Sequence, residues 1–155
     1  MKICDILKQP LIVANLHATD KEGILREMAH HLSQNATDVN AKAEDVLGAL
    51  VTRERLGSTG VGEGVAIPHA KIPGLRALVA CFGRAPQGVP FDAIDYQPVR
   101  LIFVLLVPEN SAGAHLKALA RISRLLKNPD FRERLLHLPD RDALYQAFVQ
   151  EDDKH

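Results

Sequence analysis

The sequence predicts an α/β fold: a single compact domain in which helices flank a central mixed β-sheet. Apolar residues recur at helical spacing before residue 56 and again after residue 111, whereas the segments between contain short apolar runs of strand length. The run 101–107 is apolar at every position, which predicts a strand buried on both faces. With 155 residues, 46% of them hydrophobic, the chain has material for one core. We expect residues 1–150 to form one domain and 151–155 a frayed tail.

The N-terminal part is expected to hold two amphipathic helices. Residues 3–7 predict a short helix and 11–14 a short strand. Thr19 and Glu22 form a capping-box pattern, which predicts a helix that runs to about Ser33. Asn40 is the expected N-cap of a second helix over 41–56, and Arg53 lies in its last turn.

The remaining part is expected to alternate strands with turns and then to end in helices. Residues 65–67, 78–82 and 101–107 predict strands, and the proline-containing segment 86–90 predicts a turn. Ser111 is the expected cap of a helix over 112–127. Asn128-Pro129 and Pro139-Asp140 then begin two short helices, at 131–136 and 141–149.

Composition excludes several classes of function. The charges of nineteen basic and nineteen acidic residues cancel. The protein therefore has no broad positive field that would favour binding to nucleic acid or to an anionic membrane. Residues 1–16 lack a signal-peptide core, and the run 101–107 is far too short to span a bilayer. We therefore expect a cytoplasmic protein with no direct membrane insertion. Cys4 and Cys81 form no CxxC pair, which favours packing roles over a disulfide or a zinc site.

The most informative segment is a glycine-rich loop that leads into Pro68-His69. Its glycines permit positive φ angles that turn backbone N–H groups toward an anion, and its hydroxyls add donors. Pro68 stiffens the approach to His69. The loop residues expected to bind phosphate are Gly57, Ser58, Thr59 and Gly60. No GK[ST] follows the glycines and a helix precedes them, so neither an ATP-binding P-loop nor a dinucleotide fingerprint is indicated.

These motifs resemble the phosphohistidine region of the fructose/mannitol-type enzyme IIA proteins of the bacterial phosphotransferase system. The strings that carry the resemblance are Arg53-Glu-Arg-Leu-Gly57-Ser-Thr-Gly60, Gly64-Val-Ala-Ile-Pro-His69-Ala, Phe91-Asp-Ala-Ile-Asp95-Tyr-Gln-Pro98-Val, the run 101–108 and Ala114-His115-Leu116. The first and third are most similar to the nitrogen-regulatory branch. The resemblance implies that 1–150 is an enzyme IIA type-2 domain whose His69 takes a phosphoryl group, through its outer ring nitrogen, from a histidine phosphocarrier protein. It implies no cofactor.

Two further residues have competing interpretations. Arg53 is either a cation that stabilises a helix C-terminus or a guanidinium fork for phosphate oxygens, and the resemblance favours the second. His115 shares a helical stripe with Leu119 and Ile122, which is compatible with packing alone. It also lies in a first helical turn, where a neutral imidazole is favoured, and the family has a second active-site histidine at this matching position. We therefore expect His115 to donate a hydrogen bond to the phosphoryl group.

Three functions remain open at this point. The first is a phosphohistidine carrier that acts mainly as a phosphorylation-dependent regulator of other proteins. The second is an IIA subunit that passes phosphate to a fructose/mannitol-type sugar permease, and the third is a protein-binding module that carries no phosphate. A zinc site at His69 and His115 lacks the HExxH spacing. Asp92 and Asp95 are expected to be turn and capping residues with no catalytic role.

Overall fold

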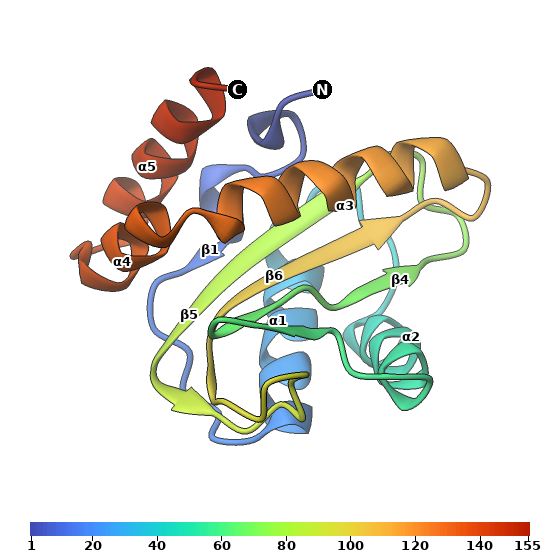
Figure 1. The fold of residues 1–155 in the computed structure, drawn as a ribbon. Helices are drawn as coiled ribbons and strands as arrows, with labels where there is room; N and C mark the ends of the chain where they lie inside the picture. The colour runs from blue at the N-terminus through green and yellow to red at the C-terminus, as the bar shows by residue number, and fades with distance from the viewer.

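The central sheet is built on the antiparallel pair β5 (Val79–Val89) and β6 (Val99–Val107), in a computed structural model that describes residues 1–155 (Figure 1). β1 (Ile12–Val13) adds in parallel to β5. β3 (Val65–Ala66) and β4 (His69–Lys71) both run parallel to β6, and β2 (Gly60–Gly62) is antiparallel to β3. The sheet is therefore six-stranded and mixed, which confirms the expected fold class.

β3 and β4 lie one after the other along the same edge of β6. Val65 is level with Leu101, and His69 is level with Leu105. Pro68 interrupts the ladder because it has no N–H to donate, but its carbonyl still accepts from the Leu105 N–H at 2.9 Å. His69 is consequently the first residue of β4, at a position fixed by the central strand.

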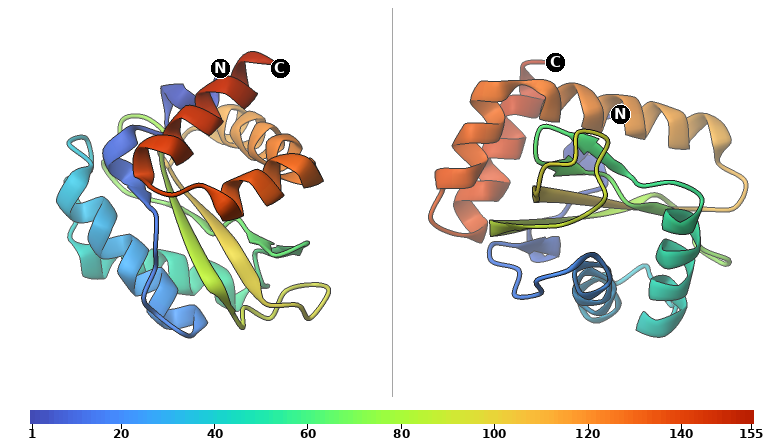
Figure 2. Two further views of the ribbon diagram at one scale, coloured as in Figure 1. Left: turned by 90° about the vertical axis from the view of Figure 1, so that its left-hand side faces the viewer. Right: turned by 60° about the horizontal axis from the view of Figure 1, so that its bottom comes forward.

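Helices cover both faces of the sheet. Figure 2 shows α1 (Lys21–Asn35) and α2 (Ala43–Arg55) on one side and α3 (Ala112–Lys127), α4 (Pro129–His137) and α5 (Arg141–Asp153) on the other. Two short 3-10 helices, η1 (Ile3–Asp5) and η2 (Gln9–Leu11), precede β1. None of these helices is both long and apolar enough to cross a membrane. α5 begins at Arg141 as expected, whereas α4 already begins at Pro129, ahead of the expected start at residue 131.

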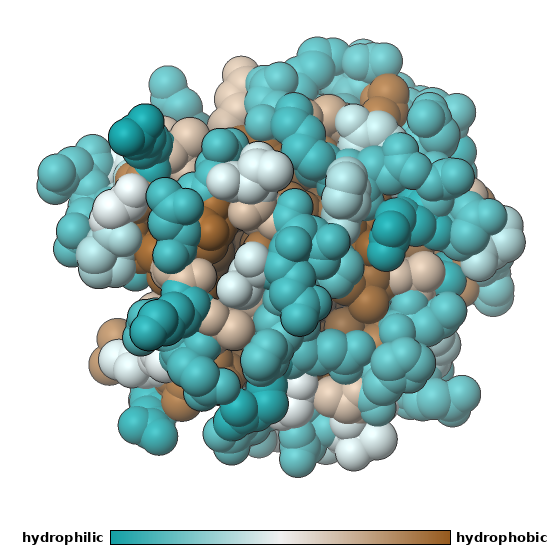
Figure 3. Space-filling model, turned by 180° about the vertical axis from the view of Figure 1, so that it is seen from behind, coloured by the Kyte–Doolittle hydropathy of each residue, from teal (hydrophilic) through white to brown (hydrophobic).

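The core is one continuous cluster of apolar side chains between the two layers. Phe148 of α5 packs against Phe82 of β5 and Phe103 of β6, with ring centroids 4.9 Å and 5.8 Å apart. Cys81 is fully buried and Cys4 is partly buried; both are free thiols, and burial raises the pKa of each. The face that Figure 3 shows is mostly hydrophilic, with apolar residues visible in recesses between the polar side chains.

Several capping predictions were wrong. α1 is capped by Asp20 rather than Thr19: the Asp20 backbone is extended, and its carboxylate accepts from the Gly23 N–H at 2.8 Å. α2 begins at Ala43, so Asn40 lies too far upstream to cap it. Ser111 occupies the N-cap position of α3, but its hydroxyl donates to the Pro108 carbonyl instead. The segment 86–90, expected as a turn, continues β5 to Val89 through an irregular register.

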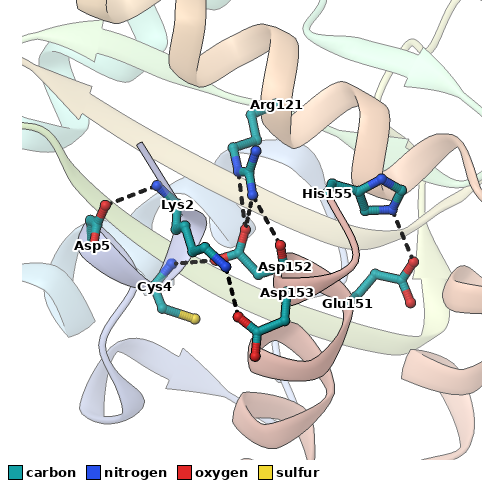
Figure 4. A network of polar contacts seen from close by, with 8 residues as sticks. All are labelled: Lys2, Cys4, Asp5, Arg121, Glu151, Asp152, Asp153 and His155. Atoms are coloured by element: carbon teal, nitrogen blue, oxygen red, sulfur yellow. Dashed lines mark hydrogen bonds and ion pairs between the residues drawn. The ribbon is translucent and has the colours of Figure 1, made fainter.

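The expectation of a frayed tail from residue 151 was also wrong. α5 continues to Asp153, and Glu151 and Asp152 are buried. Figure 4 shows the reason: the Asp152 carboxylate accepts from the Cys4 N–H at 3.1 Å and from the Arg121 guanidinium at 2.6 Å. Lys2 and Asp153 form an ion pair at 2.7 Å nearby. These contacts join both ends of the chain to α3, the helix that carries His115.

Candidate functional site

A cavity of about 460 Å³ opens between the C-terminal half of α2, β4 and the start of α3. Its lining residues are Gly48, Ala49, Thr52, Arg53, Leu56, His69, Ala70, Lys71 and His115. It therefore brings together Arg53, His69 and His115, three of the residues selected from the sequence. A larger cavity, of about 640 Å³, runs along β2, β3 and α3 but contains no histidine.

The ring of His69 is held in one tautomer by the backbone. Its Nδ1 lies 2.8 Å from the Ile67 carbonyl oxygen, which can only accept a hydrogen bond, so Nδ1 must carry the proton. In the neutral ring the lone pair then belongs to Nε2. Pro68 lies between the two residues, and its fixed φ limits how the His69 ring and the Ile67 carbonyl can move relative to each other. His69 is thus oriented with a nucleophilic Nε2.

His115 lies against His69 with an unpaired nitrogen. The two ring centroids are 5.3 Å apart with an interplanar angle of 61°. The Nε2 atom of His115 is buried and has no hydrogen-bond partner. Burial, followed by the charges of His69, Lys71 and Arg53, lowers the pKa of His115. A buried polar nitrogen without a partner is costly, so its position next to His69 indicates that a polar group completes the site.

Arg53 is positioned by the loop that follows its helix. Its Nη1 donates to the Gly57 carbonyl at 2.9 Å, which leaves the other guanidinium donors available to the cavity. This hydrogen bond connects the last turn of α2 to the loop that follows it. Both interpretations of Arg53 are therefore compatible with its place: it interacts with a helix terminus and lines the cavity that holds His69.

The loop hydroxyls are engaged within the protein. Ser58 Oγ donates to the Phe91 carbonyl at 2.8 Å and accepts from the Gly60 N–H at 3.0 Å. The Thr59 hydroxyl donates to the carboxylate of Glu54, which also accepts from the Thr59 N–H at 3.1 Å. Residues 57–60 do not line the cavity. Their direct contact with phosphate remains a prediction, while their observed contacts fix the shape of the loop beside it.

Glu54 is a buried support of the glycine loop that sequence reasoning missed. Its side chain is only 5% exposed, and it forms an ion pair with Lys21 of α1 at 2.8 Å. Together with the Thr59 contacts, this pair connects α1, the end of α2 and the glycine loop. In the sequence, only its position next to Arg53 could have drawn attention to Glu54, because a sequence does not show which carboxylate becomes buried.

Asp95 behaves as a capping residue, whereas the exposed carboxylate of Asp92 only approaches Lys21, at 3.9 Å. Asp95 accepts from the Glu63 N–H at 3.0 Å and from the Gln97 N–H at 3.1 Å, and these hydrogen bonds lower its pKa. This confirms the turn interpretation of Asp95. No group of three or more His, Cys, Asp or Glu side chains is arranged to hold a metal ion.

Fold and site together define a class: an α/β protein with a pair of histidines in a cationic surface cavity at the edge of a mixed sheet. A family model described as "Phosphoenolpyruvate-dependent sugar phosphotransferase system, EIIA 2" matches residues 5–151. The chain belongs to this family of phosphotransferase-system enzyme IIA proteins, as the sequence motifs indicated.

The relatives carry two kinds of name. The chain is 41% identical to a nitrogen regulatory protein of Bradyrhizobium diazoefficiens, over 96% of this chain and 95% of that protein. It is 36% identical to the fructose-specific EIIABC component of Bacillus subtilis, over 98% of this chain but 24% of that longer protein. The crystal structure of the nitrogen regulatory protein IIA-Ntr from Neisseria meningitidis superposes with a TM-score of 0.86 at 35% identity, over 94% of this chain and 98% of that one.

Proposed function

We propose that this protein is a phosphohistidine carrier in which Nε2 of His69 accepts and donates the phosphoryl group. One observation carries the proposal: a nucleophilic Nε2 on His69 shares a cavity with an unpaired, buried Nε2 on His115. A phosphoryl group on His69 Nε2 would supply oxygen atoms that can accept a hydrogen bond from His115 Nε2, which has no partner in the free protein. Membership of the enzyme IIA family supports the same chemistry.

The transfer step needs little beyond alignment. The lone pair of His69 Nε2 attacks the phosphorus of a phosphohistidine on a phosphocarrier protein. The donor's P–N bond breaks and its electron pair returns to the donor's ring, while a new P–N bond forms to His69. The Nδ1 proton stays in place and continues to donate to the Ile67 carbonyl, which stabilises the positive charge that the ring acquires.

Arg53 and His115 have complementary roles in this proposal. The guanidinium of Arg53 provides charge and paired donors for the phosphoryl oxygens. His115, held neutral by its lowered pKa, donates a hydrogen bond from Nε2 to an oxygen of the group. Residues 57–60 provide the loop that positions Arg53 through the Gly57 carbonyl. Arg53 and His115 both line the cavity that holds His69, and His115 Nε2 has no partner within the protein.

We propose a regulatory use of this chemistry in the cytoplasm: the phosphorylation state controls binding to other proteins. The similarity to nitrogen regulatory proteins over nearly the whole of both chains supports this reading. Phosphorylation adds about 1.5 to 2 negative charges, enough to change the affinity of a partner that contacts the cavity. Similarity to a fructose-specific component favours a second candidate, in which the phosphoryl group passes to a sugar permease.

Phosphoryl acceptance is tested by incubation with phosphoenolpyruvate, enzyme I and a histidine phosphocarrier protein, followed by intact-mass analysis under alkaline conditions. Wild type gains one phosphate, and His69→Ala gains none. His137→Ala, at an exposed histidine on α4, is the matched control and is phosphorylated like wild type. Absence of phosphate on the wild type with an active donor would support a binding module that carries no phosphate.

The two uses are separated by what the phosphorylated protein does next. For regulation, candidate partners bind the phosphorylated and free forms with different affinities in calorimetric titration. For sugar transport, the phosphoryl group moves onto the permease component within the time of a transport cycle. Equal partner affinities together with rapid onward transfer would contradict the regulatory role.

A further inference from the structure

Lys71 is a cation at the histidine site to which the mechanism above assigns no role. It lines the same cavity as His69, Arg53 and His115. His69 and Lys71 are the first and last residues of β4, and residues two apart on a strand project to the same face of the sheet. Ala70 between them is buried, as the alternation requires. The Lys71 side chain therefore projects from β4 on the side where His69 meets the cavity.

No acidic group neutralises Lys71. Its ammonium forms no ion pair within 4.0 Å and no hydrogen bond, unlike Lys21, which is held by Glu54 at 2.8 Å. The cavity lining contains no carboxylate at all. The charge of Lys71 reaches the site, because it contributes to the lowered pKa of His115. The cavity thus collects two cations, from α2 and from β4, with no counterion.

We propose that Lys71 is a second phosphate-binding cation, which contacts the phosphoryl group on His69 from the β4 side while Arg53 contacts it from the α2 side. The inference rests on the proposed function and deepens it. The Nδ1 contact of His69 already makes its Nε2 nucleophilic, so Lys71 is not needed to select the acceptor. Its contribution is to stabilise the phosphorylated state relative to the free one.

This role predicts a change in an equilibrium. When the phosphorylated phosphocarrier is mixed with this protein, the phosphoryl group distributes between the two proteins. The equilibrium constant of this exchange depends only on the free and phosphorylated states of each protein, so it is insensitive to how the two proteins dock. Lys71→Met lowers that constant roughly threefold to tenfold at low ionic strength, because an exposed charge-assisted contact to phosphate is lost. The deficit shrinks in high salt, which screens the contact, and Lys71→Arg restores most of it.

Lys42→Met is the matched control. Lys42 is an exposed, unpaired lysine at the opposite end of α2 from Arg53, and its substitution leaves the equilibrium unchanged. A second readout is the His115 pKa, measured by NMR in the unphosphorylated protein: it rises in Lys71→Met because a nearby positive charge is removed. Both Lys variants are exposed and should melt like wild type.

The outcomes separate this inference from the proposed function. An equilibrium constant in Lys71→Met equal to that of wild type, or a deficit that does not respond to salt, overturns the role of Lys71 and leaves His69 as the acceptor. A wild type that takes no phosphate overturns the proposed function, and the role of Lys71 with it.

Discussion

The rings of His69 and His115 meet edge to face with their centroids 5.3 Å apart, although they come from a strand and from a helix. Both placements depend on β6. The strand that begins with His69 pairs with the C-terminal part of β6, and α3 starts after the short loop that follows β6. One central strand therefore sets the relative position of the two imidazoles, and changes in its register would separate them.

Replacement of His115 by asparagine is expected to slow phosphoryl transfer while His69 remains the acceptor. The amide offers a shorter donor that does not reach the same point, so one hydrogen bond to the transferring group is weakened or lost. We expect a decrease in rate of about a hundredfold, at the lower end of the loss found when one transition-state donor is removed. Rapid-quench measurement with phosphorylated carrier checks this. A wild-type rate would assign His115 to packing.

His115 is also expected to titrate below the ordinary histidine range in the free protein. Burial disfavours its charged form first, and the charges of His69, Lys71 and Arg53 act in the same direction. Because the unfolded chain binds this proton more readily, the folded state loses stability as the pH falls below about 6.5, and the loss is absent above it. NMR titration of the ring measures the pKa, and His115→Asn removes this part of the pH dependence. A pKa at or above the ordinary value would show that burial and the neighbouring charges do not disfavour the charged form of His115.

Arg53→Lys tests whether the guanidinium fork matters beyond its charge. A single ammonium cannot hold the Gly57 carbonyl and bind phosphate oxygens at two points together, so transfer to His69 is expected to slow by about tenfold. Arg55→Lys, two residues along the same helix at an exposed position without an ion pair, is the control. Comparable rates in the two variants would reduce Arg53 to a helix-terminal cation.

Much of the fold was accessible from local patterns. The stripes of α1 and α2, the fully apolar β6 and the Asn128-Pro129 start of α4 all reflect burial or dihedral preferences carried by neighbouring residues. β2 and β4 were missed because each has only three residues and depends on pairing with distant segments. The end of α5 was missed because the burial of Asp152 depends on Arg121 and on the other end of the chain.

The site residues that lie in or next to local sequence motifs could be predicted from the sequence. Pro68-His69 and the end of α2 marked His69 and Arg53, which the fold brings to one cavity with His115. The sequence could not show that the Ser58 and Thr59 hydroxyls bond to Phe91 and Glu54, because these partners are selected by packing. Lys71 closes the segment that contains Pro68-His69, but nothing in the sequence assigned it a role, and its relevance emerges only from the shared cavity.

Glu54→Ala is expected to destabilise the fold by roughly 2–3 kcal/mol, because Lys21 and the backbone N–H of Thr59 lose a buried acceptor. Urea denaturation measures the change. The control is Glu44→Ala, which breaks only an exposed contact with Arg26 and should cost less than about 1 kcal/mol. Similar losses in both variants would show that the Glu54 contacts contribute no more than a surface ion pair.

In the proposed function, one particular nitrogen, Nε2 of His69, carries the phosphoryl group. The most direct measurement is a long-range ¹H–¹⁵N NMR spectrum of the ¹⁵N-labelled protein, recorded during steady phosphorylation at alkaline pH. We expect that the phosphorylated nitrogen belongs to His69 and is Nε2, with the proton retained on Nδ1 against the Ile67 carbonyl. Phosphate on Nδ1 of His69, or on His115, would contradict it.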